Sequence, residues 1–122
     1  MVRGVRGATT VNENTAEAII ATTEELMREM QRVNEYDPQD ISHVIITATE
    51  DLTAVFPARA LRNIEGYKFV PVMSAREISV PNSLEKCIRV TLTLNTNKAQ
   101  AEIQHVYLEK AVALRPDLKV DK

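Results

Sequence analysis

The sequence has 122 residues, with 15 Lys and Arg against 17 Asp and Glu, and 44% of its residues are apolar. This length suits one domain, and the apolar content is too high for a disordered chain. The near-even charge, without a strongly basic segment, argues against a nucleic-acid surface. No apolar run approaches the roughly 20 residues of a membrane helix, and the opening residues lack the apolar core of a signal peptide. The single cysteine fits a reducing compartment, so we expect a cytoplasmic protein.

The first predicted strand covers residues 1–11, in which a glycine follows each of two arginines. Arg3 and Arg6 are three residues apart, so on a regular strand their side chains face opposite sides of the sheet. We therefore expect them to have different roles. The two glycines indicate a close backbone approach or a local bend.

A long amphipathic helix is predicted from about Thr15 to Asn34. Asn14 suits the N-cap, and Glu17 three residues later resembles part of a capping box. Apolar or small residues recur at helical spacing and are expected to face the core: Ala16, Ile19, Ile20, Thr23, Leu26, Met27, Met30 and Val33. Arg28 and Arg32 lie among glutamates off this stripe, which is typical of a solvated helix face.

The β-branched run at residues 44–46 is typical of a central strand that is apolar on both faces. A short helix is expected within residues 56–67, because Pro57 suits a first helical position and Gly66 suits the exit.

Residues 67–72 predict another strand, which Pro71 limits to an edge, an end or a bulge. The segment that follows, with Glu77 in it, is expected to be mainly loop.

The segment 85–96 predicts a strand with an arginine in its middle. Successive side chains on a strand point to opposite faces, so one face collects four apolar residues: Ile88, Val90, Leu92 and Leu94. Arg89 shares the other face with Cys87, Thr91 and Thr93. A guanidinium in this position needs a partner, which can be water, a carboxylate of the protein or a bound anion. For Cys87 a buried packing role is favoured over a nucleophilic one.

The last part of the chain, residues 98–118, fits either a helix throughout or a helical turn, a strand and another turn. We favour the second, because His105, Tyr107 and Glu109 alternate with apolar neighbours. Several strands and one long helix predict a single α/β or α+β domain, in which a mixed β-sheet packs on that helix. Residues 116–122 are expected to form a flexible tail.

Motifs for covalent or metal chemistry are weak. The sequence has no Gly-rich phosphate loop, paired-cysteine motif or nucleophile elbow, and its two histidines have no evident nucleophile partner. His43 and His105 are remote from each other in sequence, so we expect no metal site. What remains is a set of arginines in or near predicted elements: Arg6, Arg59, Arg62, Arg89 and Arg115.

Arginine suits carboxylates because its planar fork can make two parallel hydrogen bonds. Several converging arginines would suit a small dicarboxylate, but sequence periodicity does not establish convergence in space. The alternative is internal ion pairing with acidic residues of the chain: Glu50, Asp51, Glu65 or Glu109. Residue types alone favour this alternative by about two to one.

Five segments together resemble the monofunctional chorismate mutases of the small trimeric, pseudo-α/β-barrel class. They are VRGVRGATT, TAVFPARALR, YKFVPV, EKCIRVTLTLNT and HVYLEKAVALRPDL, and they occur in the family's order and spacing. The resemblance covers nearly the whole chain. It implies a homotrimer that forms a pseudo-α/β barrel, with sites at the clefts between subunits.

The resemblance also implies an activity, the rearrangement of chorismate to prephenate in phenylalanine and tyrosine biosynthesis. This Claisen rearrangement is unimolecular and needs no covalent intermediate or proton transfer, so no cofactor is expected. As the ether C–O bond lengthens, negative charge grows on that oxygen and positive charge on the ring. Catalysis is then expected to rest on positioning and fixed electrostatics. A non-catalytic trimeric module that binds a small carboxylate is the alternative.

Four catalytic residues follow from the resemblance. Arg89 matches the arginine directed at the ether oxygen, while Arg6 and Tyr107 match groups that hold a substrate carboxylate. Glu77 matches the glutamate on the ring side, near the hydroxyl. Further substrate-binding positions match pocket walls and a basic rim: Phe56, Ala58, Val72 and Leu114 for the walls, and Arg59, Arg62 and Arg115 for the rim.

Three positions depart from the family pattern. Arg59 stands where a lysine is common, Met73 where a threonine can occur and Ser74 where a cysteine can occur. Backbone groups at Met73 and Ser74 are expected to bind the substrate, so changes of their side chains are expected to be tolerated.

Overall fold

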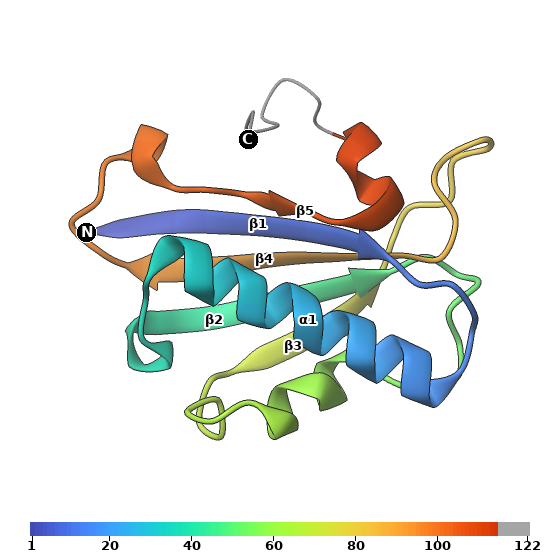
Figure 1. Ribbon diagram of the computed structural model, residues 1–122, viewed down its shortest axis with the longest axis horizontal. Coiled ribbons are helices and arrows are strands. Elements are labelled where there is room, and N and C mark those ends of the chain that lie inside the picture. Colours follow the sequence, from blue (N-terminus) through green and yellow to red (C-terminus); the bar gives the residue numbers. More distant parts are fainter. Residues whose placement is uncertain (115–122) are drawn as a thin grey trace.

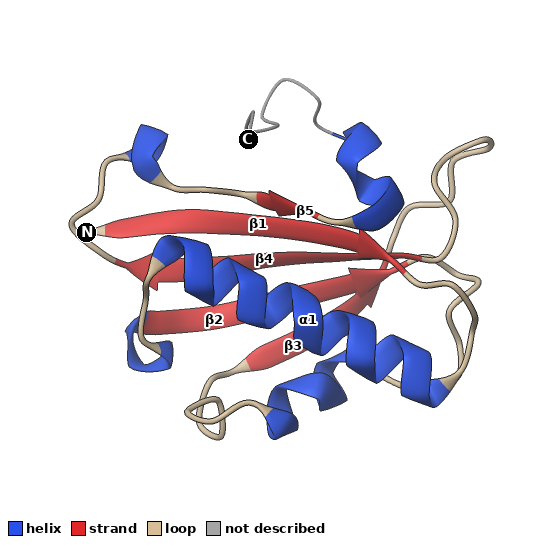
Figure 2. Cartoon of the chain, in the orientation of Figure 1, coloured by secondary structure: helices blue, strands red, loops and turns tan. Residues whose placement is uncertain are grey.

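The computed structural model describes residues 1–114, in which five strands form one sheet and a long helix crosses one of its faces (Figures 1 and 2). The strands are β1 (Val2–Thr10), β2 (Ile41–Ala48), β3 (Val72–Arg76), β4 (Cys87–Asn95) and β5 (Val106–Tyr107). The helices are α1 (Ala16–Asn34) and the short 3-10 helices η1 (Pro38–Asp40), η2 (Pro57–Asn63), η3 (Gln100–Glu102) and η4 (Glu109–Leu114). The tail predicted at 116–122 lies outside the described residues.

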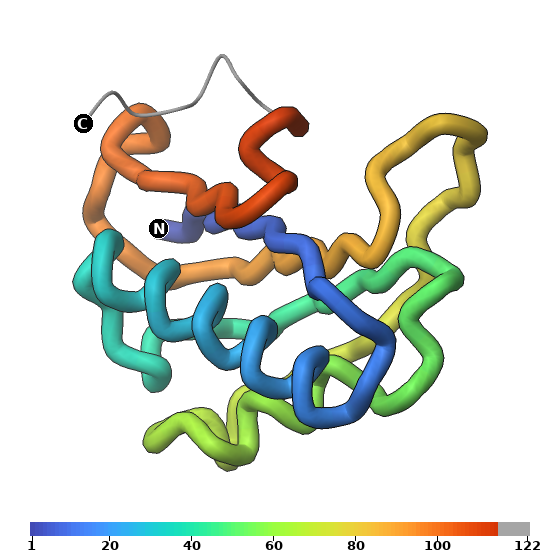
Figure 3. Tube along the Cα trace, turned by 45° about the vertical axis from the view of Figure 1, so that its right-hand side comes forward, coloured from blue at the N-terminus to red at the C-terminus, as the bar shows by residue number. Residues whose placement is uncertain are grey.

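The sheet is mixed, as predicted, with the strand order β3-β2-β4-β1-β5. β4 runs antiparallel to both β1 and β2, whereas β5 is parallel to β1 and β3 is parallel to β2. In this register Arg89 lies opposite Ala8 of β1 on one side and opposite Thr47 of β2 on the other. Figure 3 shows the segment that carries β5 and η4 beside β1, and the loop between β3 and β4 extending from the body.

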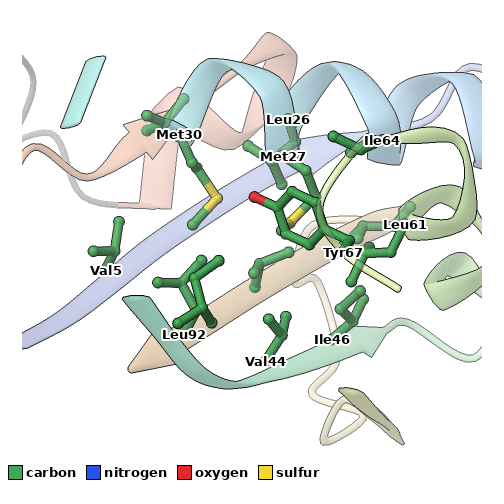
Figure 4. Packing of buried hydrophobic residues seen from close by; sticks show 14 of the residues in the cluster. Val5, Leu26, Met27, Met30, Val44, Ile46, Leu61, Ile64, Tyr67 and Leu92 are labelled. Atoms are coloured by element: carbon green, nitrogen blue, oxygen red, sulfur yellow. The ribbon is translucent and has the colours of Figure 1, made fainter. Parts of the chain in front are cut away.

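The core lies between one face of the sheet and the layer formed by α1 and the η2 region (Figure 4). The apolar stripe predicted for the helix supplies Ile19, Leu26, Met27 and Met30, all fully buried. Alternate strand residues meet them from the sheet, among them Val5, Val44, Ile46, Ile88, Val90 and Leu92. Because this alternation buries one face of each strand, the residues in between are turned to the open face of the sheet.

The start of α1 differs from the prediction. Thr15, and not Asn14, is the N-cap, and its hydroxyl accepts a hydrogen bond from the backbone N–H of Ala18 over 3.1 Å. The Asn14 side-chain oxygen instead accepts from the backbone N–H groups of Thr53 and Ala54. The side chain of Asn14 therefore binds a loop that is distant in sequence and does not cap the helix. A local sequence pattern does not predict such a contact.

Gly7 shows why one of the two early glycines is needed. A Cβ added to Gly7 would lie 2.5 Å from the Met30 sulfur and 3.1 Å from Cδ1 of Leu26, so β1 approaches α1 too closely for a side chain. A Cβ at Gly4 would meet nothing within 4 Å. β1 continues through both glycines as one regular strand, paired with β4 from Val2 to Thr10.

The strand predicted at 67–72 is wrong. Tyr67 is buried in the core, and Val70 donates a backbone hydrogen bond to its carbonyl over 3.1 Å, which closes a turn. The strand β3 begins only at Val72 and runs to Arg76, through residues expected to be loop. Aromatic and β-branched residues at 67–70 mimic a strand, but here they connect η2 to the sheet edge.

Other predicted elements of secondary structure are confirmed. η2 begins at Pro57 as expected, and Gly66 past its end has a φ of 94°, which favours glycine. A 3-10 turn, a short strand and a second 3-10 turn end the described chain, as favoured over one helix. β2 lies inside the sheet, but its second face is open, with Ile45 39% exposed.

Within residues 1–114 no helix is long and apolar enough to cross a membrane.

Candidate active site

The open face of the sheet carries the arginine that the sequence left unpartnered. Ile88 and Val90 beside it in β4 are buried under α1, so Arg89 points to the opposite face. The same alternation puts Arg6 of β1 and Thr47 of β2 on this open face, flanking Arg89 from the two neighbouring strands. Three strands therefore bring polar groups together that are remote in sequence.

Arg6 is held in two ways, by Tyr107 of β5 and by His105 just before this strand. Its guanidinium Nη2 donates to the hydroxyl of Tyr107 over 3.2 Å. Its backbone N–H donates to Nδ1 of His105 over 3.0 Å, so this ring nitrogen is the unprotonated one. β5 is only two residues long, and its parallel pairing with β1 sets Tyr107 next to Ala8. The short strand thus fixes where Arg6 can reach.

Glu77 lies just after β3 and is anchored through both its backbone and its side chain. Its N–H donates to the carbonyl of Ala48 over 2.9 Å, which continues the pairing of β3 with β2. Its Oε2 accepts a hydrogen bond from the hydroxyl of Thr47 and lies 3.4 Å from Nε of Arg89. The Glu77 side chain is 22% exposed and that of Arg89 is 51% exposed.

These groups line one pocket of about 220 Å³. Its walls are formed by Arg6, Gly7, Ala8, Ile45, Thr47, Glu77, Arg89, Val90, Thr91, Tyr107 and Leu114. The four residues expected to be catalytic are thus together, with Leu114 among them. Two guanidinium groups face one carboxylate, so the pocket has a net positive charge, which suits a small anion.

Most of the other expected substrate-binding residues lie away from this pocket. A second and larger cavity is lined by residues of η2 and β3, including Phe56, Ala58, Arg59, Arg62, Val72 and Ser74. Met73 of β3 is 67% exposed and lines neither cavity. Arg115 lies outside the described residues. One chain therefore carries the expected site in two separate parts.

Internal ion pairing, which residue types favoured, is limited in the structure. Within residues 1–114, Arg28 and Arg32 pair with helix glutamates, as predicted for a solvated helix face. Arg89 pairs with Glu77, which was not among the acidic partners proposed. Among the described ion pairs none involves Arg6, Arg59 or Arg62, which leaves these guanidinium groups for other partners.

Cys87 lies on the same strand face as Arg89 but is 3% exposed. Burial raises the pKa of its thiol, and the nearby Arg89 guanidinium opposes this only in part. The thiol therefore stays protonated near neutral pH, as the packing role predicts, because the thiolate is the nucleophilic form.

Sequence reasoning missed several residues of the pocket: Ala8, Ile45, Thr47, Val90 and Thr91. Thr91 was assigned to the correct face of its strand but given no role. Thr47 had no signal at all, because its importance comes from its register opposite Arg89, and register depends on pairing between distant strands.

The fold and the pocket define an α/β protein with a pocket that two arginines line, and its charge suits a small anion. The sequence matches the family described as chorismate mutase type I over residues 2–118. It is 47% identical over 122 residues to chorismate mutase AroH of Bacillus subtilis (strain 168), covering 100% of this chain and 96% of that protein. It is 51% identical over 120 residues to chorismate mutase AroH of Thermus thermophilus, covering 98% of each.

A solved structure agrees with these relatives. A chorismate mutase from Clostridium thermocellum superposes with a TM-score of 0.87 and 48% sequence identity, covering 90% of this chain and 97% of that one. This chain belongs to the chorismate mutase type I family. Its function is that of a chorismate mutase, an isomerase, so the resemblance drawn from its segments is confirmed and the non-catalytic alternative is not supported.

Proposed function

We propose that this chorismate mutase converts chorismate to prephenate in the pocket beside Arg89, by positioning and fixed charges. The observation that carries the proposal is that Arg6, Glu77, Arg89 and Tyr107 line one pocket. The reaction is an intramolecular rearrangement, so the protein has to stabilise charge that develops within one molecule. Preorganised donors are effective in this task because they need no reorganisation when the charge appears.

Each group has a role that fits its contacts. Arg6 and Tyr107 already share a hydrogen bond, so together they present two donors to a substrate carboxylate. Arg89, on the middle strand, supplies a guanidinium to the ether oxygen as its negative charge grows. Glu77 lies on the other side of that guanidinium, where its carboxylate can face the ring and its hydroxyl.

The ion pair between Arg89 and Glu77 is compatible with this role. Charge-assisted N–H···O hydrogen bonds are typically about 2.7–2.9 Å long, whereas these two atoms are 3.4 Å apart. About half of the Arg89 side chain is exposed, so its other nitrogens can reach a ligand. The ion pair with Glu77 therefore orients the Arg89 guanidinium and leaves other N–H groups of it available to donate to a ligand.

We further propose that the complete site needs two subunits of a homotrimer. Five of the residues expected to form the pocket walls and the basic rim line a cavity of their own: Phe56, Ala58, Val72, Arg59 and Arg62. Phe56, Val72 and Met73 are large apolar side chains that are 71%, 39% and 67% exposed. Exposed apolar groups in this number are typical of a surface that another chain covers.

The activity is tested directly on the purified protein in the presence of a chelator. We expect chorismate to be consumed, followed as loss of its ultraviolet absorbance, and prephenate to form. A folded protein that leaves chorismate unchanged would reject the proposal.

The shared site is tested by mixing two defective variants. Arg89→Ala removes one part of the site, and the double change Arg59→Ala with Arg62→Ala removes the other. If each site combines parts of two subunits, unfolding and reassembling the variants together yields some intact sites. We expect activity above the sum of the two separate proteins, whereas a simple sum would show that each chain forms its own site.

A further inference from the structure

Thr47 lines the pocket and forms a hydrogen bond to one member of the proposed catalytic pair, Glu77 and Arg89. Its hydroxyl donates a hydrogen bond to Oε2 of Glu77, the same oxygen that lies 3.4 Å from Nε of Arg89. Thr47 is also directly opposite Arg89 in the pairing of β2 with β4. The hydroxyl therefore acts on the Glu77 carboxylate from the strand beside the arginine.

The hydrogen bond from Thr47 affects the positions of the Glu77 carboxylate and the Arg89 guanidinium. The Glu77 side chain is mostly buried, so its carboxylate needs hydrogen-bond donors. Thr47 supplies one of them, and the β-branched side chain of threonine is restricted at χ1, which limits where the hydroxyl oxygen can lie. Without it, Arg89 is the donor that the described residues still offer to this carboxylate, and a closer pair would occupy the guanidinium that is proposed to serve the substrate.

We propose that Thr47 is a positioning residue, whose hydroxyl holds the Glu77 carboxylate so that Arg89 stays available to the substrate ether oxygen. This inference rests on the roles proposed above for Glu77 and Arg89. Thr47 itself acts through Glu77. Its loss should therefore slow the chemical step more than it weakens substrate binding.

The test is a pair of substitutions that separate the hydroxyl from the shape of the side chain. Thr47→Val keeps the shape and removes the donor, and it is expected to lower kcat about tenfold with KM changed less than about threefold. Thr47→Ser keeps the donor and is expected to remain within about threefold of the wild type in kcat. Thr93→Val is the matched control, since Thr93 lies on the same face of β4 and bonds His43, away from the pocket.

A double-mutant cycle separates this role from a structural one. In a Glu77→Ala background the carboxylate is gone, so Thr47→Val is expected to change kcat less than twofold further. A structural defect would reduce activity equally in both backgrounds. Circular dichroism and the thermal midpoint verify the fold, and Thr47→Ala replaces Thr47→Val if that variant does not fold.

The outcomes distinguish this inference from the function on which it rests. Near-normal kcat in Glu77→Ala and Arg89→Ala would overturn both. Large losses in those two variants, together with a Thr47→Val protein of wild-type kcat, would overturn the role of Thr47 alone. An equal loss in Thr47→Ser and Thr47→Val would also overturn it, because the hydroxyl would then not matter.

Discussion

Arg6 and Tyr107 are 101 residues apart in sequence, yet the guanidinium of Arg6 donates to the Tyr107 hydroxyl over 3.2 Å. The contact depends on the parallel pairing of β1 with the two-residue strand β5. It joins the first and last strands of the described chain at the pocket. The position of Arg6 is therefore set by the C-terminal part of the protein.

Replacing Tyr107 by Phe is expected to weaken substrate binding more than catalysis. The variant keeps the ring but removes a donor to the substrate carboxylate and a partner of Arg6. We expect KM to rise about tenfold, the effect typical of one hydrogen bond to a charged group, with kcat within about threefold. Steady-state kinetics measure both constants, and a fall in kcat at unchanged KM would assign Tyr107 to the chemical step.

Replacing Arg89 by Ala is expected to lower kcat by at least the roughly 10²–10³-fold typical of losing one donor to a developing oxyanion. Arg89→Lys is the informative companion, because it keeps the charge but loses the planar fork. We expect it to recover only part of the rate. A near-normal kcat in Arg89→Ala would show that the ether oxygen has another partner.

The rate is expected to be flat around pH 7. The rearrangement transfers no proton to or from the protein, so no group has to titrate near neutrality during turnover. Measuring kcat from pH 6 to 8 tests this, in buffers of constant ionic strength. A sharp bell centred near pH 7 would instead indicate general acid–base catalysis.

Gly7→Ala is expected to destabilise the protein by about 1–3 kcal/mol, the range for an overpacked core. Its Cβ would lie 2.5 Å from the sulfur of the buried Met30. Gly4→Ala is the matched control in the same strand, because its Cβ would meet nothing within 4 Å of the chain. Denaturant unfolding measures both variants, and equal stability would mean that Met30 moves aside without cost.

Cys87 is expected to make stability fall at alkaline pH. Burial raises the pKa of its thiol, whereas in the unfolded chain the thiol loses its proton near its ordinary value of 9.0. Above that pH the unfolded state binds fewer protons than the folded state, so the free energy of unfolding decreases as pH rises. Below it this contribution is fully present.

The comparison of wild type with Cys87→Ala isolates this effect. Burial also raises the pKa of Tyr36 and of Tyr67, but both tyrosines are present in each protein and cancel from the difference. Urea unfolding at pH 7.5 and pH 10 is expected to show a larger loss of stability in the wild type. Equal losses would mean that the thiol does not contribute.

Much of the architecture could be predicted because it follows from local periodicity. The helical spacing of apolar residues predicted α1 within one residue of its start, and strict alternation predicted both faces of β4. Where local patterns were ambiguous, the chain was misread. The aromatic and β-branched residues at 67–70 suggested a strand. In the structure Tyr67 is buried in the core, and a backbone hydrogen bond from Val70 to its carbonyl closes a turn instead.

The candidate site, too, was predicted in part from the sequence and decided in part by the tertiary structure. The residue types, their order along the chain and the family resemblance pointed to Arg6, Glu77, Arg89 and Tyr107. That these four line one pocket depends on pairing between β1, β4 and β5 and on the anchor of Glu77 to β2. A role for Thr47 could be inferred only after the register of β2 with β4 was known.

Periodicity is a property of neighbours in sequence, so it reveals which way a side chain points from its own strand. Which distant groups meet across the sheet is set by backbone pairing and core packing summed over the whole chain. The face that carries Arg89 could thus be read from twelve consecutive letters, Glu85 to Thr96. The pairing of Arg89 with Glu77, and the hydrogen bond from Thr47 to Glu77, became known only once the strands had been assembled, because register depends on pairing over the whole sheet.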